Sequence, residues 1–105
     1  MHKFKRISVK ETEALIEKND VTIVDIRDYH SYQSGHISDS IHVTGDKAEA
    51  FMETADRNKP LIIYCYHGNS SQDAARYFSE KGFSAVYSMD GGFEAWRVKD
   101  LSGKD

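Results

Sequence analysis

Short runs of apolar, β-branched residues alternate along this chain with segments of helical periodicity, and this alternation restricts the fold more than any other feature. The strongest apolar runs are Val21–Ile26 and Leu61–Tyr64, and a third lies at Ser84–Tyr87. Nearly continuous runs of this kind are typical of strands that are covered on both faces. Strands that alternate with helices require right-handed crossovers and a mainly parallel sheet. We therefore predict an α/β fold in which the sheet lies between helical layers.

Capping residues and glycines delimit the predicted helices. Ser8 and Glu11 have the spacing of a capping box at the start of an amphipathic segment. The predicted helices are Val9–Lys18, Tyr29–Ser34 (ended by Gly35), Asp46–Thr54, Ser71–Lys81 (ended by Gly82) and Phe93–Lys99, with a further short strand at Ser40–Val43. Residues 101–105 are expected to fray. Because the chain has 105 residues, no repeat and no linker, we predict a single domain over 1–105.

Charge and composition exclude several classes of function. The balance of 14 Lys and Arg against 17 Asp and Glu gives a net charge of −3, which provides no general attraction to nucleic acid or anionic lipid. The longest apolar run, 61–66, is far shorter than the roughly 20 residues of a membrane span. The basic start, 1–6, leads into no apolar stretch, so we do not expect it to act as a secretory signal. We expect a cytoplasmic protein.

A single cysteine excludes an internal disulfide and any multi-cysteine zinc site. Three histidines, His30, His36 and His42, recur every six residues, but Gly35 interrupts any helix that would align them. The sequence therefore predicts no metal site, and nothing in it calls for a cofactor.

The second strong strand runs directly into a loop that carries chemistry. After Leu61–Tyr64 the chain continues as the cysteine loop, which reads Cys65-Tyr66-His67-Gly68-Asn69-Ser70-Ser71. In a parallel sheet, ligands bind outside the carboxyl ends of the strands. A glycine at position 68 allows the backbone to curl, so that successive N–H groups point into one anion-binding concavity. The next helix adds the N-terminal end of its dipole, and Ser70 and Asp73 have the spacing of a second capping box.

A cysteine at the rim of such a concavity has a lowered pKa, because the N–H groups stabilise the thiolate. The surrounding charges agree, since no Asp or Glu occurs between Arg57 and Gln72. The alternative is an inert buried cysteine that merely ends a strand. We favour a reactive Cys65 thiolate.

A thiolate in an anion-binding loop attacks an electrophile that carries negative charge, which leaves two reactions. A phosphatase requires an arginine six residues after the cysteine to hold the phosphoryl oxygens, and that position is Ser71. Transfer of a sulfane sulfur, as from thiosulfate, requires less, because backbone N–H groups suffice to hold sulfite and then a persulfide. An outside thiol then accepts the sulfur without a second cysteine. Phosphatase activity is the weaker alternative.

Three segments resemble the single-domain rhodaneses, which are thiosulfate sulfurtransferases, and most closely the bacterial GlpE type. The first is Val24-Asp25-Ile26-Arg27-Asp28, followed by Gly35-His36-Ile37. The second is the cysteine loop, and the third is Asp90-Gly91-Gly92-Phe93-Glu94-Ala95-Trp96. Together they span almost the whole chain in the family's order. The resemblance implies a rhodanese-like fold, with a mainly parallel central sheet of about five strands and helices on both faces.

The resemblance also implies the roles of the loop residues. Cys65 would attack the outer sulfur of thiosulfate and release sulfite, and the backbone amides and side chains of the loop would hold the resulting persulfide. The loop residues concerned are Tyr66, His67, Gly68, Asn69, Ser70 and Ser71. The sulfur would then pass to cyanide or to a thiol such as reduced thioredoxin, in a double displacement. A persulfide carrier fed by a protein donor is the alternative.

Many family members carry a loop arginine either directly after the cysteine or at the sixth loop position, and here these positions hold Tyr66 and Ser70. Only N–H dipoles then remain to bind a dianion, so we predict weak affinity for thiosulfate.

Residues outside the loop are expected to support it. Asp25 and Arg27 end the first strong strand, where they either orient the loop through hydrogen bonds to its N–H groups or form an ordinary ion pair. His36 is expected to act as a structural hydrogen-bonding residue, and His67 to line the mouth of the pocket. Tyrosines 29, 32 and 66 form a candidate exposed aromatic patch on a monomer or weak dimer.

Overall fold

The computed structural model describes residues 3–102, and side chains as far as Lys99. The elements in chain order are β1 (Lys5–Ile7), α1 (Val9–Lys18), β2 (Thr22–Asp25), α2 (Tyr29–Ser34), β3 (Ile41–His42), a 3₁₀ turn η1 (Gly45–Lys47), α3 (Ala48–Thr54), β4 (Leu61–Tyr64), α4 (Ser70–Glu80), β5 (Val86–Met89) and α5 (Gly92–Ser102). Within the described residues, no helix is long and apolar enough to cross a membrane.

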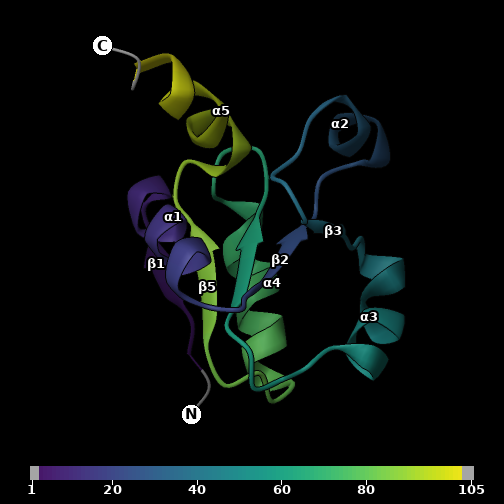
Figure 1. The fold of residues 1–105 in the computed structure, drawn as a ribbon. Coiled ribbons are helices and arrows are strands. Elements are labelled where there is room, and N and C mark those ends of the chain that lie inside the picture. Colours follow the sequence, from purple (N-terminus) through teal and green to yellow (C-terminus); the bar gives the residue numbers. More distant parts are fainter. Residues whose placement is uncertain (1–2, 103–105) are drawn as a thin grey trace.

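The five strands form one parallel sheet in the order β1-β5-β4-β2-β3. This arrangement confirms the α/β prediction (Figure 1). Strand β4 lies at the centre of the sheet, between β5 and β2, so its carboxyl end is flanked by two other strand ends. The loop that follows β4 therefore lies at the place where a parallel sheet binds ligands.

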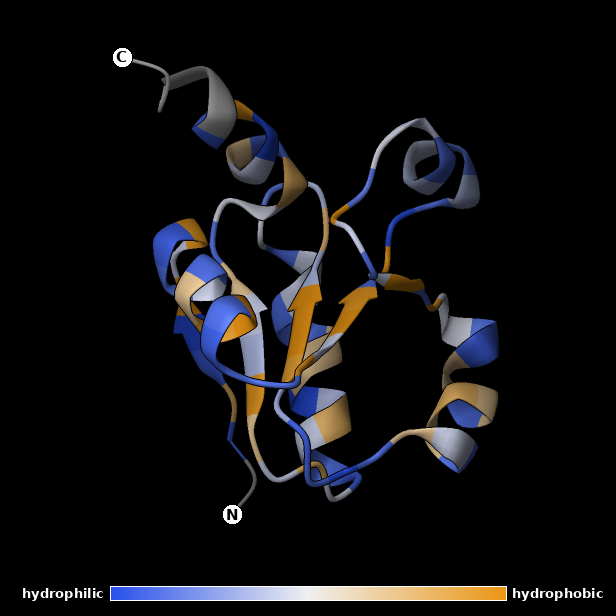
Figure 2. Ribbon diagram, in the orientation of Figure 1, coloured by the Kyte–Doolittle hydropathy of each residue, from blue (hydrophilic) through white to orange (hydrophobic). Residues whose placement is uncertain are grey.

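Helices cover both faces of the sheet. Neighbouring strand residues point to opposite sides, so the apolar runs place side chains on both faces, and each face is buried against helices. On β2, Val24 packs in a cluster with side chains of α3 and α4, whereas Ile23 packs in a second cluster with side chains of α1 and α5. On β4, Ile63 and Tyr64 divide in the same way. Both faces are thus apolar, and much of β2 and β4 is coloured as hydrophobic in Figure 2. This double burial explains why these strands are recognisable as nearly continuous apolar runs.

Local signals gave several boundaries correctly. Helix α1 begins at the predicted capping box: the Ser8 side chain accepts from the Glu11 N–H at 3.0 Å, and the Ser8 N–H donates to the Glu11 carboxylate at 2.8 Å. Helix α2 ends at Gly35, as predicted, and β4 has the predicted bounds.

Other boundaries differ from the predictions. Strand β1 was not predicted, because two of its three residues are charged and exposed and it pairs through its backbone at the sheet edge. Strand β5 begins two residues later than predicted, since the N–H of Ser84 is held by the carbonyl of Arg57 at 3.0 Å. Helix α3 is shorter than predicted because η1 precedes it. Helix α5 continues through 101–102, which we expected to fray, and 103–105 lie outside the described residues.

Candidate active site

Cys65 follows the last residue of β4 at the centre of the sheet, and only 5% of its surface is exposed. The chain then curls through the rest of the cysteine loop and enters α4 at Ser70. The curl depends on Gly68, which has a φ of +95°, and a Cβ there would lie 2.8 Å from the backbone nitrogen of Gly91. Glycine is therefore required at position 68, both for its backbone conformation and for its close approach to the end of β5.

The curled loop directs several hydrogen-bond donors at the sulfur. The N–H of Gly68 donates to the Cys65 Sγ at 3.2 Å, and the N–H of Ser71 donates to it at 3.3 Å. The Ser71 hydroxyl lies 3.4 Å from the same sulfur. These contacts form the N–H concavity that the sequence predicts, with the sulfur inside it.

The environment of the sulfur has two opposing effects on the pKa of the Cys65 thiol. Burial raises this pKa, but hydrogen bonds from the Ser71 hydroxyl and from the backbone N–H groups of Ser71, Gly68 and His67 lower it, and the net effect is a pKa below the ordinary value. This is the predicted direction. A thiol with a lowered pKa supplies more of the nucleophilic thiolate near neutral pH.

The N-terminus of α5 holds the first half of the cysteine loop. The N–H of Phe93 donates to the carbonyl of Cys65 at 2.8 Å, and the N–H of Glu94 donates to that of Tyr66 at 3.1 Å. This close approach requires a glycine at position 92, where a Cβ would lie 2.4 Å from the Tyr66 carbonyl. The second half of the loop is held by the side-chain amide of Gln72, which donates to the carbonyl of Gly68 at 2.9 Å.

Tyr66 connects the loop to α2. Its hydroxyl donates to the carboxylate of Asp28 and also contacts the hydroxyl of Ser31. Asp28 caps α2 by accepting from the N–H of Ser31 at 3.1 Å. These hydrogen bonds hold the pKa of the Asp28 carboxyl well below its usual range, and the hydrogen bond from Tyr66 has the largest effect.

Asp25 and Arg27 form a buried ion pair rather than hydrogen bonds to the loop. The Arg27 guanidinium donates to the Asp25 carboxylate at 2.7 Å and to the carbonyl of Gly35 at 2.6 Å. Its carbon lies 4.3 Å from the ring centroid of Phe93 and 5.6 Å from that of Tyr66. Of the two predicted roles, the ordinary ion pair is the one formed, and hydrogen bonds from this pair to loop N–H groups are not formed among the described residues. The guanidinium contacts the loop at the face of the Tyr66 ring.

The histidines and tyrosines occupy different surroundings. His36 is exposed, its Nδ1 lies 2.7 Å from the carbonyl of Tyr32, and the two rings stack at 3.9 Å, so its contacts lie within the α2 region and not on the loop. His67 is exposed on the loop. Tyr29 and Tyr66 are 59% and 44% exposed, whereas Tyr32 is half-buried. Among the described residues, no group of three His, Cys, Asp or Glu side chains is placed to hold a metal ion.

The predicted capping box of Ser70 and Asp73 is wrong. Helix α4 begins at Ser70, its N-cap is Asn69, and no side-chain cap is formed there. Asp73 instead pairs with Arg76 at 3.1 Å. The N–H of Ser71, in the first turn of α4, donates to the Cys65 sulfur, which takes the place of a capping oxygen.

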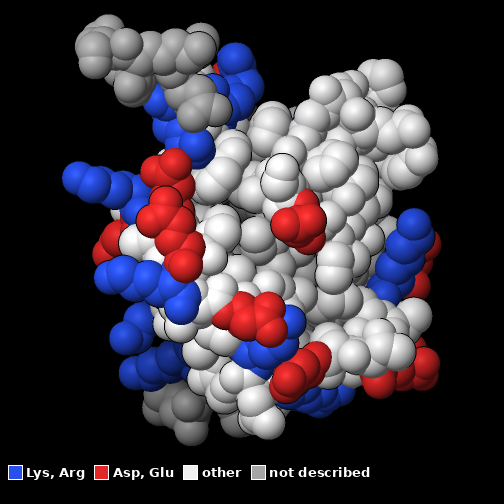
Figure 3. Space-filling model, viewed as in Figure 1, with Lys and Arg blue, Asp and Glu red and all other residues white. Residues whose placement is uncertain are grey.

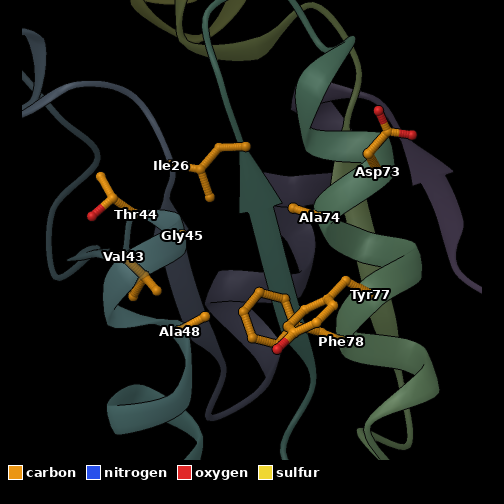
Figure 4. A pocket seen from close by; sticks show the side chains of 9 residues that line it. All are labelled: Ile26, Val43, Thr44, Gly45, Ala48, Asp73, Ala74, Tyr77 and Phe78. Atoms are coloured by element: carbon orange, nitrogen blue, oxygen red, sulfur yellow. The ribbon is translucent and has the colours of Figure 1, made fainter.

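A hollow of about 450 Å³ lies between α4 and the η1–α3 segment and is separate from the cysteine loop (Figure 4). Its lining is mostly apolar, with Ile26, Val43 and Ala48 opposite Ala74 and Phe78, and it includes no residue of the cysteine loop.

The surface over α2, which contributes no Lys, Arg, Asp or Glu, forms an uncharged area in Figure 3.

Reasoning from sequence missed three groups at the site. One is Gln72, although glutamine at the third position of a helix is a known signal for contact with the preceding loop. The others are Ser88 on β5, whose hydroxyl lies 2.8 Å from that of Ser71, and the N–H groups at the start of α5. Both come from elements distant in sequence and carry no local signal.

Comparison with known proteins agrees with this geometry. A model of the rhodanese-like domain matches residues 8–99. The thiosulfate sulfurtransferase GlpE of Pseudomonas savastanoi pv. phaseolicola is 52% identical over 98 residues, which cover 93% of this chain and 92% of that protein. A rhodanese-like domain protein from Staphylococcus aureus superposes with a TM-score of 0.78 at 26% identity, over 89% of this chain and 91% of that one.

A second solved structure, from Rhodopseudomonas palustris, is described as a protein of unknown function and possible tyrosine phosphatase. It has a TM-score of 0.81 at 29% identity, and the match covers 92% of this chain and 82% of that one. The family model spans nearly the whole chain. The three segments that resemble the rhodaneses begin at the ends of β2, β4 and β5 and lie at the carboxyl edge of the parallel sheet. This chain therefore belongs to the rhodanese-like domain family.

Proposed function

We propose that this chain is a thiosulfate sulfurtransferase that carries sulfur as a persulfide of Cys65. The observation that carries the proposal is the set of groups at the sulfur, at the carboxyl end of the central strand: two backbone N–H groups donate to it, and the Ser71 hydroxyl lies within hydrogen-bond distance. A relative with 52% identity bears the name of this activity.

The reaction consists of two displacements at sulfur. The Cys65 thiolate attacks the outer sulfur of thiosulfate, a new S–S bond forms, and sulfite leaves with the electron pair of the old one. In the second step an acceptor attacks the outer sulfur of the persulfide, and the Cys65 thiolate leaves. A lowered thiol pKa assists both steps, because the thiolate is the nucleophile in the first and the leaving group in the second.

The acceptor is cyanide in an assay and a thiol, such as reduced thioredoxin, in a cytoplasmic setting. No Lys or Arg occurs in the cysteine loop, so thiosulfate is held by dipoles alone. We therefore expect weak binding of thiosulfate, and a Michaelis constant in the low micromolar range would contradict this expectation.

Phosphatase activity is not proposed, although one structural relative is described as a possible tyrosine phosphatase. The loop lacks the arginine that holds phosphoryl oxygens, and the positive charge of Arg27 beneath the Tyr66 ring is paired with Asp25. Hydrolysis of an aryl phosphate that is lost in Cys65→Ser would reverse this conclusion.

Intact mass of the purified protein, before and after thiosulfate, tests the proposal. We expect a gain of one sulfur, which cyanide removes, and no gain in Cys65→Ser. Failure of the wild-type protein to gain sulfur, with the thiol shown to be free by alkylation, would contradict thiosulfate as the donor. A persulfide carrier would then be the better description, and a protein persulfide donor should load the same cysteine.

A further inference from the structure

Ser88 is a polar residue in an otherwise apolar part of the core. Two residues before it on β5, Val86 packs in the apolar cluster between the sheet and α4, and strand alternation directs Ser88 to that same side. Its side chain is fully buried. A buried hydroxyl is costly unless it is hydrogen-bonded, so its partner indicates its role.

The partner of Ser88 is the hydroxyl of Ser71, at 2.8 Å, and Ser71 is also fully buried. The Ser71 hydroxyl in turn lies 3.4 Å from the Cys65 sulfur. Three side chains from β5, α4 and the end of β4 therefore form one chain of hydrogen bonds, here called the hydroxyl chain: Ser88, Ser71, Cys65. No other side-chain hydrogen bond of Ser88 is formed among the described residues.

The number of protons and acceptors in the hydroxyl chain depends on the state of the sulfur. If the thiol donates its proton to Ser71, one of the two serine hydroxyl protons is left without an acceptor within the chain. If the sulfur is a thiolate, Ser71 donates to it and Ser88 donates to Ser71, so that both hydroxyl protons are accepted. Hydrogen bonds arranged in series in a buried site also strengthen one another.

We propose that Ser88 is a positioning residue, which directs the Ser71 hydroxyl toward the sulfur and so favours the Cys65 thiolate. The inference that Ser88 favours the thiolate stands on the hydroxyl chain alone. The role of that thiolate in sulfur transfer rests on the proposed function. In that reaction Ser88 assists the sulfur twice, first as the attacking thiolate and then as the departing one, without contacting the substrate.

The pH dependence of Cys65 alkylation by iodoacetamide tests this role without thiosulfate, so its result is independent of the proposed function. We expect Ser88→Ala to raise the thiol pKa by about half a pH unit, the effect of losing one bond of a cooperative pair. Ser88→Thr, which retains a hydroxyl, should keep the thiol pKa close to that of the wild-type protein.

A double substitution separates positioning from general destabilisation. If Ser88 acts through Ser71, then Ser88→Ala has no further effect on the thiol pKa when Ser71 is already alanine. The matched control is Ser79→Ala, which removes a different buried serine hydroxyl, on α4, that donates to the carbonyl of Lys3 at 3.1 Å. This control should lower the unfolding free energy and leave the thiol pKa unchanged. An unchanged thiol pKa in Ser88→Ala, or an equal shift in the Ser71→Ala background, would overturn the proposal.

Discussion

Gly92 is the residue at which α5 comes into contact with the cysteine loop. It has a φ of +59°, and a Cβ there would lie 2.4 Å from the carbonyl carbon and oxygen of Tyr66 and 2.5 Å from the carbonyl oxygen of Cys65. Those neighbours are backbone atoms and cannot rotate away. We predict that Gly92→Ala lowers the unfolding free energy by about 3 kcal/mol, as left-handed strain and backbone displacement together require. Urea denaturation measures this change.

Gly92→Ala should also affect the sulfur, because the displaced carbonyls accept from the N–H groups of Phe93 and Glu94. A loop that shifts loses alignment with the sulfur, and the thiol pKa should rise in the same variant. Gly45→Ala is the control, since a Cβ at that position meets nothing within 4 Å. The explanation fails if Gly45→Ala is equally destabilising, or if the loop tolerates Gly92→Ala with no change in thiol reactivity.

At the scale of elements, sequence predicts those boundaries that are determined locally. The capping box at Ser8 marks the start of α1, the glycine at position 35 marks the end of α2, and the apolar run Leu61–Tyr64 gives both bounds of β4; these boundaries are confirmed. Strand β1 was not predicted because it pairs with β5 at the sheet edge through backbone groups, and two of its three side chains are exposed and charged, so no apolar run marks it. The start of α4 was predicted to within one residue, but its capping was not, because the Ser71 N–H donates to the sulfur of Cys65 instead of to a serine or aspartate cap.

The residues of the candidate site also divide into those that local sequence predicts and those that only the fold brings together. The sequence indicates Cys65, the curl at Gly68 and the anion-binding character of the loop, since all belong to one continuous segment. It does not indicate Ser88, which reaches Ser71 only because β5 and β4 are neighbours in the sheet. For Asp25 and Arg27 the sequence left two roles open, hydrogen bonds to the loop or an ordinary ion pair. The ion pair is the one formed, because the backbone N–H and the guanidinium of Arg27 both donate to the Asp25 carboxylate.

The two helix starts lead to a paired prediction. Ser8→Ala removes a formed capping box from α1 and should lower the unfolding free energy by about 1 kcal/mol. Ser70→Ala, at the expected but absent capping box of α4, should change it by less than about 0.5 kcal/mol, as at other exposed sites. Urea denaturation of both variants checks the pair, and equal losses would mean that Ser70 caps α4 after all.

For the whole molecule, the lowered pKa of the Cys65 thiol links stability to pH. The folded protein releases this proton at a lower pH than the unfolded chain does, whose thiol has a pKa of about 8.5. The resulting stabilisation is fully present above the unfolded pKa and is lost as the pH falls through the folded pKa. Between those two values, the free energy of unfolding therefore gains a contribution that increases with pH.

The difference in unfolding free energy between the wild-type protein and Cys65→Ser isolates this contribution, because serine does not titrate and the other groups cancel unless they are coupled to the sulfur. We expect the difference to be constant below the folded pKa, to increase by at most about 1.4 kcal/mol per pH unit, and to level off above the unfolded pKa. Urea denaturation in reductant at several pH values measures it. A difference that decreases with pH would mean that burial outweighs the donors at the sulfur. The protein would then raise the thiol pKa and disfavour the thiolate on which the proposed sulfur transfer depends.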